Sequence, residues 1–271
     1  MSVFLQKLGI TIDFYDFLIA WSLIFTRIFV IILITPFLGG RGVPGRVRFV
    51  TSFCLSVYVF ILLKDNLLSH LPESPGIIFA LFFKEIFLGM AIGVTSIMCF
   101  YAIEAAGRII DNQRGSANAQ IFLPALGQVS IFGLFQFWLG LALFLFLGGH
   151  TVFLKSVLQG FVDVPVYALP QIAPGVSPFL QLMVRMSADV LILGVQLAAP
   201  VLIAIFLTDL VLGIANKMAP QIPVFEIGFM MKGYVGVAMV YLSIMVLASQ
   251  MDIFFGVMQD NVVRVFRYFV T

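Results

Sequence analysis

The sequence predicts an all-α, polytopic integral membrane protein with bent helices and helical hairpins. Of its 271 residues, 62% are hydrophobic and only 10% are charged, whereas soluble domains carry about 25% charged residues. The mean hydropathy is +1.13. A soluble fold of this size could not bury so many phenylalanine and leucine side chains, so the long apolar runs are assigned to a bilayer. The chain lacks the ten-residue segments of alternating polarity that are typical of membrane barrels.

Three apolar segments make up the first part of the chain. They cover residues 14–38, 49–63 and 77–103, and polar, turn-rich loops separate them. The first and third are long enough to cross about 30 Å of hydrocarbon as helices, and the second is shorter. We therefore expect three helices before the centre of the chain.

The second part of the chain begins with an apolar segment at residues 129–147, which residues 151–161 continue. Residues 162–178 contain four prolines and cannot form a continuous helix. The run at 179–214 is too long for one ordinary span, and Pro200 near its centre should kink it or split it into two packed pieces. A turn at 216–223 should then lead into a last helix and produce an antiparallel pair.

We interpret residues 1–271 as a single membrane domain. The proline-rich stretch at 162–178 divides it into two helical parts, residues 1–161 and residues 179–271.

A cluster of charged and amide side chains at the centre of the chain suggests the functional region. In a helix, Glu104, Arg108 and Asp111 share one face because they are spaced by four and three residues. Gly115 can end this helix, and residues 116–128 follow as a polar loop with glycine and proline. A charged helix face that opens into such a loop suggests a pathway through a membrane.

Several charges lie inside apolar runs, where each should face protein or water instead of lipid. Arg185 and Asp189 are four residues apart and can pair, either as a proton or ion relay or as a structural ion pair. Lys84 and Glu85 point about 100° apart around a helix and need partners elsewhere, as does Asp209. The predicted charged network at helix or subunit interfaces comprises Lys84, Glu85, Glu104, Arg108, Asp111, Arg114, Arg185, Asp189 and Asp209.

The sequence contains no pattern that indicates catalysis, a cofactor or a metal ion. His70 and His150 stand alone, and no His, Cys, Asp or Glu spacing resembles a metal site. No glycine-rich phosphate loop of the Walker type is present. A net charge of +2 gives no reason to expect nucleic-acid binding. We also expect no cleaved signal peptide. On the residues alone, a component of a protein-export gate and a secondary transporter or ion channel for small solutes both stay open.

Most of the chain resembles the FliR/SctT family, the R/T subunit of the bacterial type III secretion export gate. The similarity rests on patches that occur in the same order as in the family: residues 43–48, 84–93, 104–107 with 110–115, 146–150, 199–203, 209–213 and 218–225. Within the family, Lys84-Glu85 and Asp111-Asn-Gln-Arg-Gly115 look more like the injectisome branch than the flagellar branch. The Leu123-Pro124 pair departs from the Asp-Pro or Asn-Pro that many relatives have there.

The resemblance implies a place in a helical, hetero-oligomeric cone at the centre of the secretion-system base in the bacterial inner membrane. The implied partners are the P/R-type and Q/S-type gate subunits, the U/B-type switch subunit, the V/A-type export subunit, exported protein substrates and membrane lipid. Residues 1–161 would resemble a P-type subunit, and residues 179–271 a Q-type hairpin. The loop that resembles the family's plug comprises Gly115, Ser116, Ala117, Asn118, Ala119, Gln120, Ile121, Phe122, Leu123 and Pro124.

Overall fold

The computed structural model describes residues 14–40, 42–67, 71–72, 74–115, 121–123, 127–169, 177–221 and 223–270. This part of the chain is almost entirely helical. Five of its helices are long and apolar enough to cross a membrane, or six if the neighbouring helices Ile131–Phe146 and Gly149–Asp163 count as one broken span. The predicted all-α, polytopic membrane architecture is therefore confirmed.

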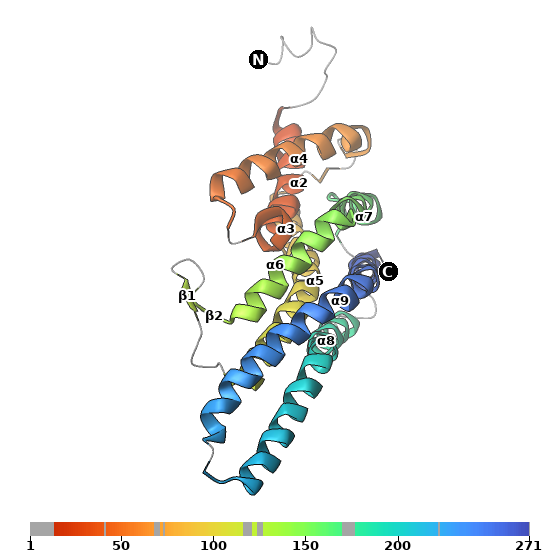
Figure 1. The fold of residues 1–271 in the computed structure, drawn as a ribbon. Helices are drawn as coiled ribbons and strands as arrows, with labels where there is room; N and C mark the ends of the chain where they lie inside the picture. The colour runs from red at the N-terminus through yellow and green to blue at the C-terminus, as the bar shows by residue number, and fades with distance from the viewer. Residues whose placement is uncertain are drawn as a thin grey trace. The chain divides into compact units, whose positions relative to one another are not determined.

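Figure 1 shows the helices, which range from one turn to more than forty residues. In order they are α2 (Phe14–Ile34), α3 (Pro36–Gly39), α4 (Gly45–Leu67), α5 (Pro75–Gln113), α6 (Ile131–Phe146), α7 (Gly149–Asp163), α8 (Ser177–Met218) and α9 (Val224–Val270). Two short strands, β1 (Ile121–Leu123) and β2 (Gly127–Val129), lie between α5 and α6.

The helices pack into two compact units. Unit 1 contains Met1–Ile97, His150–Leu182 and Met258–Thr271, and unit 2 contains Met98–Gly149 and Met183–Val257. The helices α5, α8 and α9 each contribute to both units. These boundaries reflect packing, whereas the predicted division at 162–178 rested on the prolines in that stretch. The likeness of the two parts to P-type and Q-type subunits stays a prediction.

In unit 1, α4 packs on α2 through a series of aromatic side chains. The α2 members are spaced by four residues and therefore lie on one face of that helix. The ring pairs, with their centroid distances, are Phe17–Phe60 at 5.0 Å, Trp21–Phe53 at 5.3 Å and Phe25–Phe49 at 5.5 Å. The Trp21 indole N–H also donates to Ser56 Oγ at 3.0 Å, so the polar atom of the largest side chain is satisfied.

Two glycines of α5 allow α2 to approach closely within unit 1. A Cβ atom on Gly89 would lie 2.9 Å from the carbonyl oxygen of Arg27, and one on Gly93 would lie 2.7 Å from Ile34 Cβ. Small residues at such crossings are the usual means of close helix packing in membranes. This contact positions Glu85 of α5 opposite Arg27 of α2.

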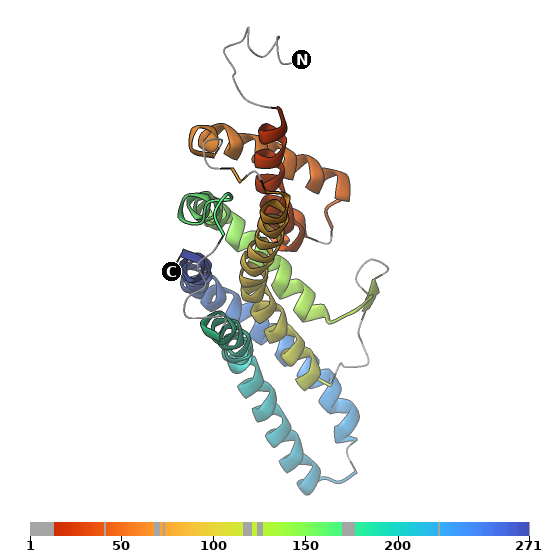
Figure 2. The same cartoon turned by 180° about the vertical axis from the view of Figure 1, so that it is seen from behind.

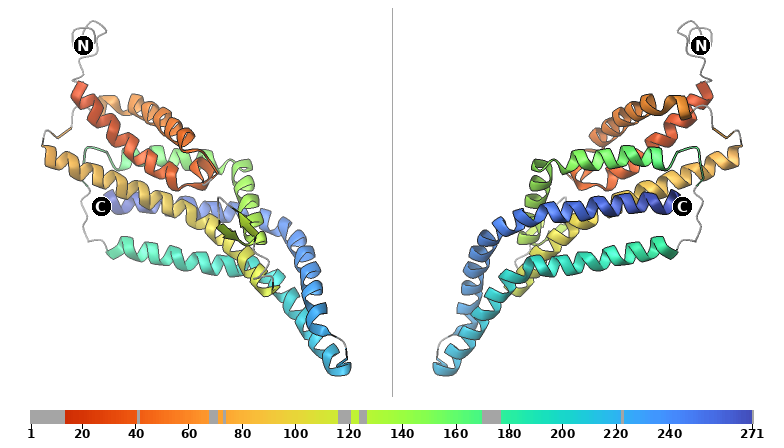
Figure 3. Two further views of the ribbon diagram at one scale, coloured as in Figure 1. Left: turned by 90° about the vertical axis from the view of Figure 1, so that its left-hand side faces the viewer. Right: turned by 90° about the vertical axis from the view of Figure 1, so that its right-hand side faces the viewer.

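Within unit 2, α8 and α9 run antiparallel as a hairpin, which Figures 1 and 2 show from opposite sides. The helix α8 contains Pro200 and is continuous from Ser177 to Met218, so of the two predicted outcomes, a kink or a split into two pieces, the split does not occur. The part of α8 that belongs to unit 2 is bent (Figure 3), in agreement with the predicted kink. A proline removes one backbone hydrogen bond, and a helix held by neighbouring helices can absorb that loss by bending.

The core of unit 2 joins all four of its helices. Its buried members are Ala106, Ile110, Phe132, Ala198, Val201, Ile205 and Val240. The helices α5 and α6 cross at Gly107, where a Cβ atom would lie 2.5 Å from the backbone nitrogen of Gly133. This crossing brings the last turn of α5 next to the first turn of α6, and therefore brings together the two ends of the central loop.

The crossing predicts a contrast between two glycine substitutions. Gly107→Ala should destabilise the protein by on the order of 1–3 kcal/mol, because the added methyl group meets rigid backbone. Gly256→Ala is the matched control, since a Cβ atom there meets nothing within 4 Å. It should be neutral or slightly stabilising, because alanine favours helix over glycine. Thermal unfolding in detergent measures both, and equal melting temperatures for the two variants would contradict the packing at Gly107.

Candidate functional site

A buried charge cluster in unit 1 joins α2, α5 and the end of α7. Arg27 and Glu85 are both fully buried, and Arg27 Nη2 donates to Glu85 Oε1 at 2.9 Å. The Arg27 Nε group donates to the other carboxylate oxygen. Two parallel hydrogen bonds of this kind are the strongest arrangement for an arginine and a carboxylate.

The rest of the Arg27 guanidinium contacts α7 and the residue that follows it. Arg27 Nη1 donates to the carbonyl oxygen of Gly160 at 3.2 Å, and Nη2 donates to that of Val164 at 2.9 Å. Its Cζ atom lies 4.3 Å from the centre of the Phe161 ring. A cation near the carbonyl end of a helix is stabilised by the helix dipole. Arg27 therefore binds the end of α7 in addition to pairing with Glu85.

Lys84 completes the cluster by holding the segment after α7. Its ammonium group lies 2.7 Å from Glu85 Oε1 and donates to the carbonyl oxygens of Pro165, Val166 and Ala168 at 2.8, 3.2 and 2.9 Å. Lys84 and Glu85 therefore contact each other and also have the partners elsewhere that their helical spacing requires. Sequence reasoning did not include Arg27 in the network. The sequence feature that could have identified Arg27 is its position as a charged residue in the middle of the apolar segment at residues 14–38.

A second polar cluster lies in unit 2, where the central loop begins and ends. Asp111, in the last turn of α5, is 5% exposed. Ser130 Oγ donates to Asp111 Oδ2 at 2.5 Å, and the backbone N–H of Phe132 donates to the same oxygen at 2.9 Å. Ser130 is also the N-cap of α6 and accepts from the backbone N–H of Gly133. A carboxylate at a helix N-terminus is favoured by the dipole, so Asp111 joins the two ends of the loop.

Arg114 strengthens this anchor from the last residues before the loop. Its Nη2 atom donates to Asp111 Oδ1 at 2.5 Å, and its Cζ atom lies 4.2 Å from the centre of the Phe132 ring. Asp111 therefore pairs with Arg114 and with the start of α6. Asp111 and Arg108 were predicted to share one helix face, but the ion pair described for Arg108 is with Glu104.

The loop itself contains a short hairpin, which the sequence interpretation of residues 116–128 as a plain loop did not include. The strands β1 and β2 pair antiparallel, with Ile121 opposite Val129 and Leu123 opposite Gly127. Isoleucine, phenylalanine and valine favour extended backbone, which explains the pairing. Of the predicted plug residues, Gly115, Ile121, Phe122 and Leu123 are described. Ser116, Ala117, Asn118, Ala119, Gln120 and Pro124 lie outside the described residues.

The remaining members of the predicted network fall into different settings. Glu104 and Arg108 pair at 2.5 Å, but the Arg108 side chain is 58% exposed, and exposed pairs contribute little to stability. Arg185 is exposed, and no ion pair joins it to Asp189 among the described residues, so the expected pair is absent from this structure. Asp209 of α8 finds its expected partner in Lys232 of α9, at 2.6 Å.

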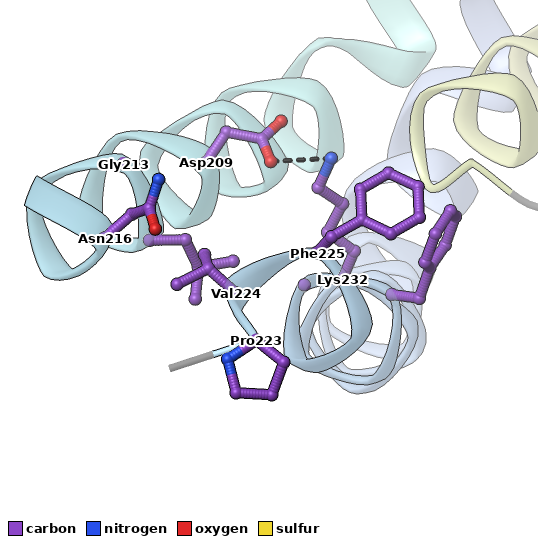
Figure 4. A pocket seen from close by; sticks show the side chains of 10 residues that line it. Asp209, Gly213, Asn216, Pro223, Val224, Phe225 and Lys232 are labelled. Atoms are coloured by element: carbon purple, nitrogen blue, oxygen red, sulfur yellow. Dashed lines mark ion pairs between the residues drawn. The ribbon is translucent and has the colours of Figure 1, made fainter. Parts of the chain in front are cut away.

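The Asp209–Lys232 pair borders a cavity of about 490 Å³ near the turn of the α8–α9 hairpin. Figure 4 shows the two side chains pointing toward each other from the two helices, with Asn216, Pro223 and Phe225 around the same space. Phe229 contributes a further wall. The hairpin is therefore joined by charge near its turn but is not filled there.

These features define a multi-pass helical membrane protein with a hairpin-containing loop fixed between two helices. The chain belongs to the family described as bacterial export proteins, family 1, which it matches over residues 18–258.

Its relatives include proteins of flagellar and translocation systems. It is 26% identical to the flagellar biosynthetic protein FliR of Aquifex aeolicus, over 94% of this chain and 95% of that one. It is 30% identical to FliR of Bacillus subtilis, over 80% and 83% of the two chains. It is also 30% identical to the Yop proteins translocation protein T of Yersinia pestis, over 79% and 82%.

The comparisons confirm the predicted FliR/SctT family and a role in bacterial protein export. None of these relatives carries an enzyme's name, in agreement with the prediction of a non-catalytic protein. The flagellar and Yop relatives are equally similar at 30%, so the injectisome assignment stays a prediction.

The buried cluster predicts a large effect of Glu85→Gln. Removing the carboxylate charge leaves Arg27 buried without its counter-ion, and breaking such a pair costs about 3–5 kcal/mol. Glu104→Gln is the control, because its exposed pair is worth about 0–1 kcal/mol. The triple variant Arg27→Met/Lys84→Met/Glu85→Met should recover much of the loss, since it also removes the buried Lys84 ammonium and leaves no isolated charge. Melting temperatures in detergent measure all three, and a Glu85→Gln protein as stable as Glu104→Gln would contradict the cluster.

Proposed function

We propose that this chain is a structural subunit of a type III protein export gate in the bacterial inner membrane. In this proposal it forms part of the entrance and channel through which unfolded protein substrates leave the cytoplasm. Membership of the export family supports the proposal, as does the presence of five apolar helices of membrane-spanning length. The loop from Gly115 to Pro124 acts as the plug of that channel.

The observation that carries the plug assignment is the anchor at Asp111. One buried carboxylate binds both the end of α5 and the start of α6, so the loop leaves and returns at a single fixed place. The segment in between contains a paired hairpin. A passive connector between helices whose ends already meet needs only a few residues. A longer, internally paired loop on a rigid base suits a part that blocks a passage.

The proposed partners are P/R-type and Q/S-type gate subunits, with the U/B-type switch subunit and the V/A-type export subunit also in contact with the gate. The α8–α9 hairpin carries many exposed large apolar side chains, among them Val211, Met218, Phe225 and Met245. Such side chains need lipid or another protein around them. A Q-type hairpin of similar shape would cover them by packing helix against helix.

Replacing the loop tests the plug. Deleting residues 116–123, or replacing them with a Gly-Ser segment of equal length, should leave assembly intact because the Asp111 anchor lies outside the change. Both variants should raise ion conductance through the assembled gate, since each removes the apolar Ile121-Phe122-Leu123 segment. Planar-bilayer recordings on the purified complex measure this. A complex that assembles with the loop replaced and conducts no more than the parent would rule out the plug.

Co-purification tests the gate against the small-solute transporter. The chain should be unstable alone in detergent and should become stable when expressed with the P- and Q-type subunits of the same genome. Tandem affinity purification, with the tag on this chain, measures the association. An unrelated multi-pass protein with the same tag is the control. A monodisperse, stable protein on its own that takes up a small solute into liposomes would favour the transporter instead.

A further inference from the structure

We infer that Phe229 and the Asp209–Lys232 pair are positioning residues for the central loop, which they hold at its first residue through α9. The inference rests on the proposed function, in which the loop has a closed position that blocks the channel. The contacts that carry it all lie within unit 2.

The first contact joins α9 to the start of the loop. Gly115 has φ +77°, a left-handed conformation that glycine adopts without strain. A Cβ atom on Gly115 would lie 2.6 Å from Phe229 Cε1, so the phenyl ring packs directly on the Gly115 backbone. Any side chain at position 115 would displace the ring. The direction in which the loop leaves α5 therefore depends on where Phe229 stands.

A second contact lies seven residues further along α9, at Gly236, and joins α9 to Arg114 at the end of α5. A Cβ atom on Gly236 would lie 2.5 Å from Arg114 Cδ. Residues seven apart lie on the same face of a helix, so one face of α9 carries both Phe229 and Gly236. This face contacts Gly115, the first residue of the loop, and Arg114, the residue before it, and Arg114 is itself bound to Asp111. A rotation of α9 would act on the loop and on its anchor together.

The Asp209–Lys232 pair fixes that rotation. Lys232 follows Phe229 by three residues and lies on a neighbouring part of the same helix. Its ammonium group reaches Asp209 of α8 at 2.6 Å, with side-chain exposures of 21% and 39% (Figure 4). The pair joins α9 to α8 close to Phe229, whose ring also packs edge-on against Phe225 at a centroid distance of 4.9 Å. Without the pair, the first turns of α9 have no charged link to α8 in the described residues.

The cavity gives Phe229 a place to move. The same ring that packs on Gly115 also lines the space of about 490 Å³ between α8 and α9. The Phe229 side chain is 45% exposed, so a ring with backbone on one side and an open pocket on the other can leave Gly115 at little cost. The ion pair across this cavity therefore opposes a movement that packing alone would permit.

The test compares five variants in a Cys54→Ala/Cys99→Ala background that carries Leu123→Cys as a reporter in β1. The chain is expressed with its P- and Q-type partners, and the assembled complex is purified. Phe229→Ala removes the ring, Asp209→Asn breaks the ion pair, and Asp209→Lys/Lys232→Asp reverses it. Tyr234→Ala and Glu226→Gln are matched controls, because both side chains are exposed on α9 and neither lines the cavity.

The first readout is the rate at which a maleimide labels the reporter, and the second is ion conductance. Phe229→Ala and Asp209→Asn should raise the labelling rate several-fold, the reversed pair should return it toward the parent value, and the controls should leave it unchanged. Equal labelling in Phe229→Ala and in the parent would overturn the inference. Faster labelling with unchanged conductance would support the positioning role and would instead disprove the plug.

If Phe229→Ala does not assemble, a milder substitution at the same position tests the inference. Phe229→Leu keeps apolar bulk but removes the ring that covers Gly115, so it should assemble and still label faster than the parent. If Phe229→Leu labels like Tyr234→Ala, the ring does not position the loop. If neither Phe229 variant assembles while both controls do, Phe229 acts in assembly and the inference is wrong.

Discussion

The structure of unit 1 depends on one buried carboxylate. Glu85 has no exposed surface, and a charge in that position is tolerated only with close opposite charges and complete hydrogen bonding. Arg27 and Lys84 supply both, and their remaining donors bind carbonyl oxygens from Gly160 to Ala168. Segments far apart in sequence are thereby joined at one point. The arrangement of α2, α5 and the end of α7 follows from the need to neutralise these charges away from water.

Unit 2 uses a carboxylate in a different way. Asp111 binds Arg114 at the end of α5 and the first residues of α6. These partners lie at the two ends of the central loop. This arrangement fixes the base of the loop. Gly107 and Gly133 permit it, because only glycine allows α5 and α6 to approach closely enough. A loop whose two ends are fixed at one rigid base is the feature of this chain that best fits control of a passage.

The hairpin of α8 and α9 relates the anchored loop to a role in export. It presents apolar side chains outward, which suits lipid or neighbouring subunits. On α9, Phe229 contacts the first residue of the loop and Gly236 contacts the residue before it. Membership of the bacterial export family gives the chain its general role. The loop anchor and the α9 contacts support a more specific one, in which packing of the hairpin and position of the loop are linked through a few side chains.

The sequence by itself determined the helices, the end of α5 at Gly115, and the need of Glu85 and Asp209 for partners. These depend on local quantities, namely the apolar character of a run, the conformational freedom of glycine and the cost of a charge in an apolar run. Only the tertiary structure decided that Arg27 pairs with Glu85, that Lys232 pairs with Asp209 and that Arg185 does not pair with Asp189. It also decided that α8 bends instead of breaking at Pro200 and that the loop contains a strand pair. Such outcomes depend on which helices pack together, and no local pattern encodes the side chains that packing brings into contact.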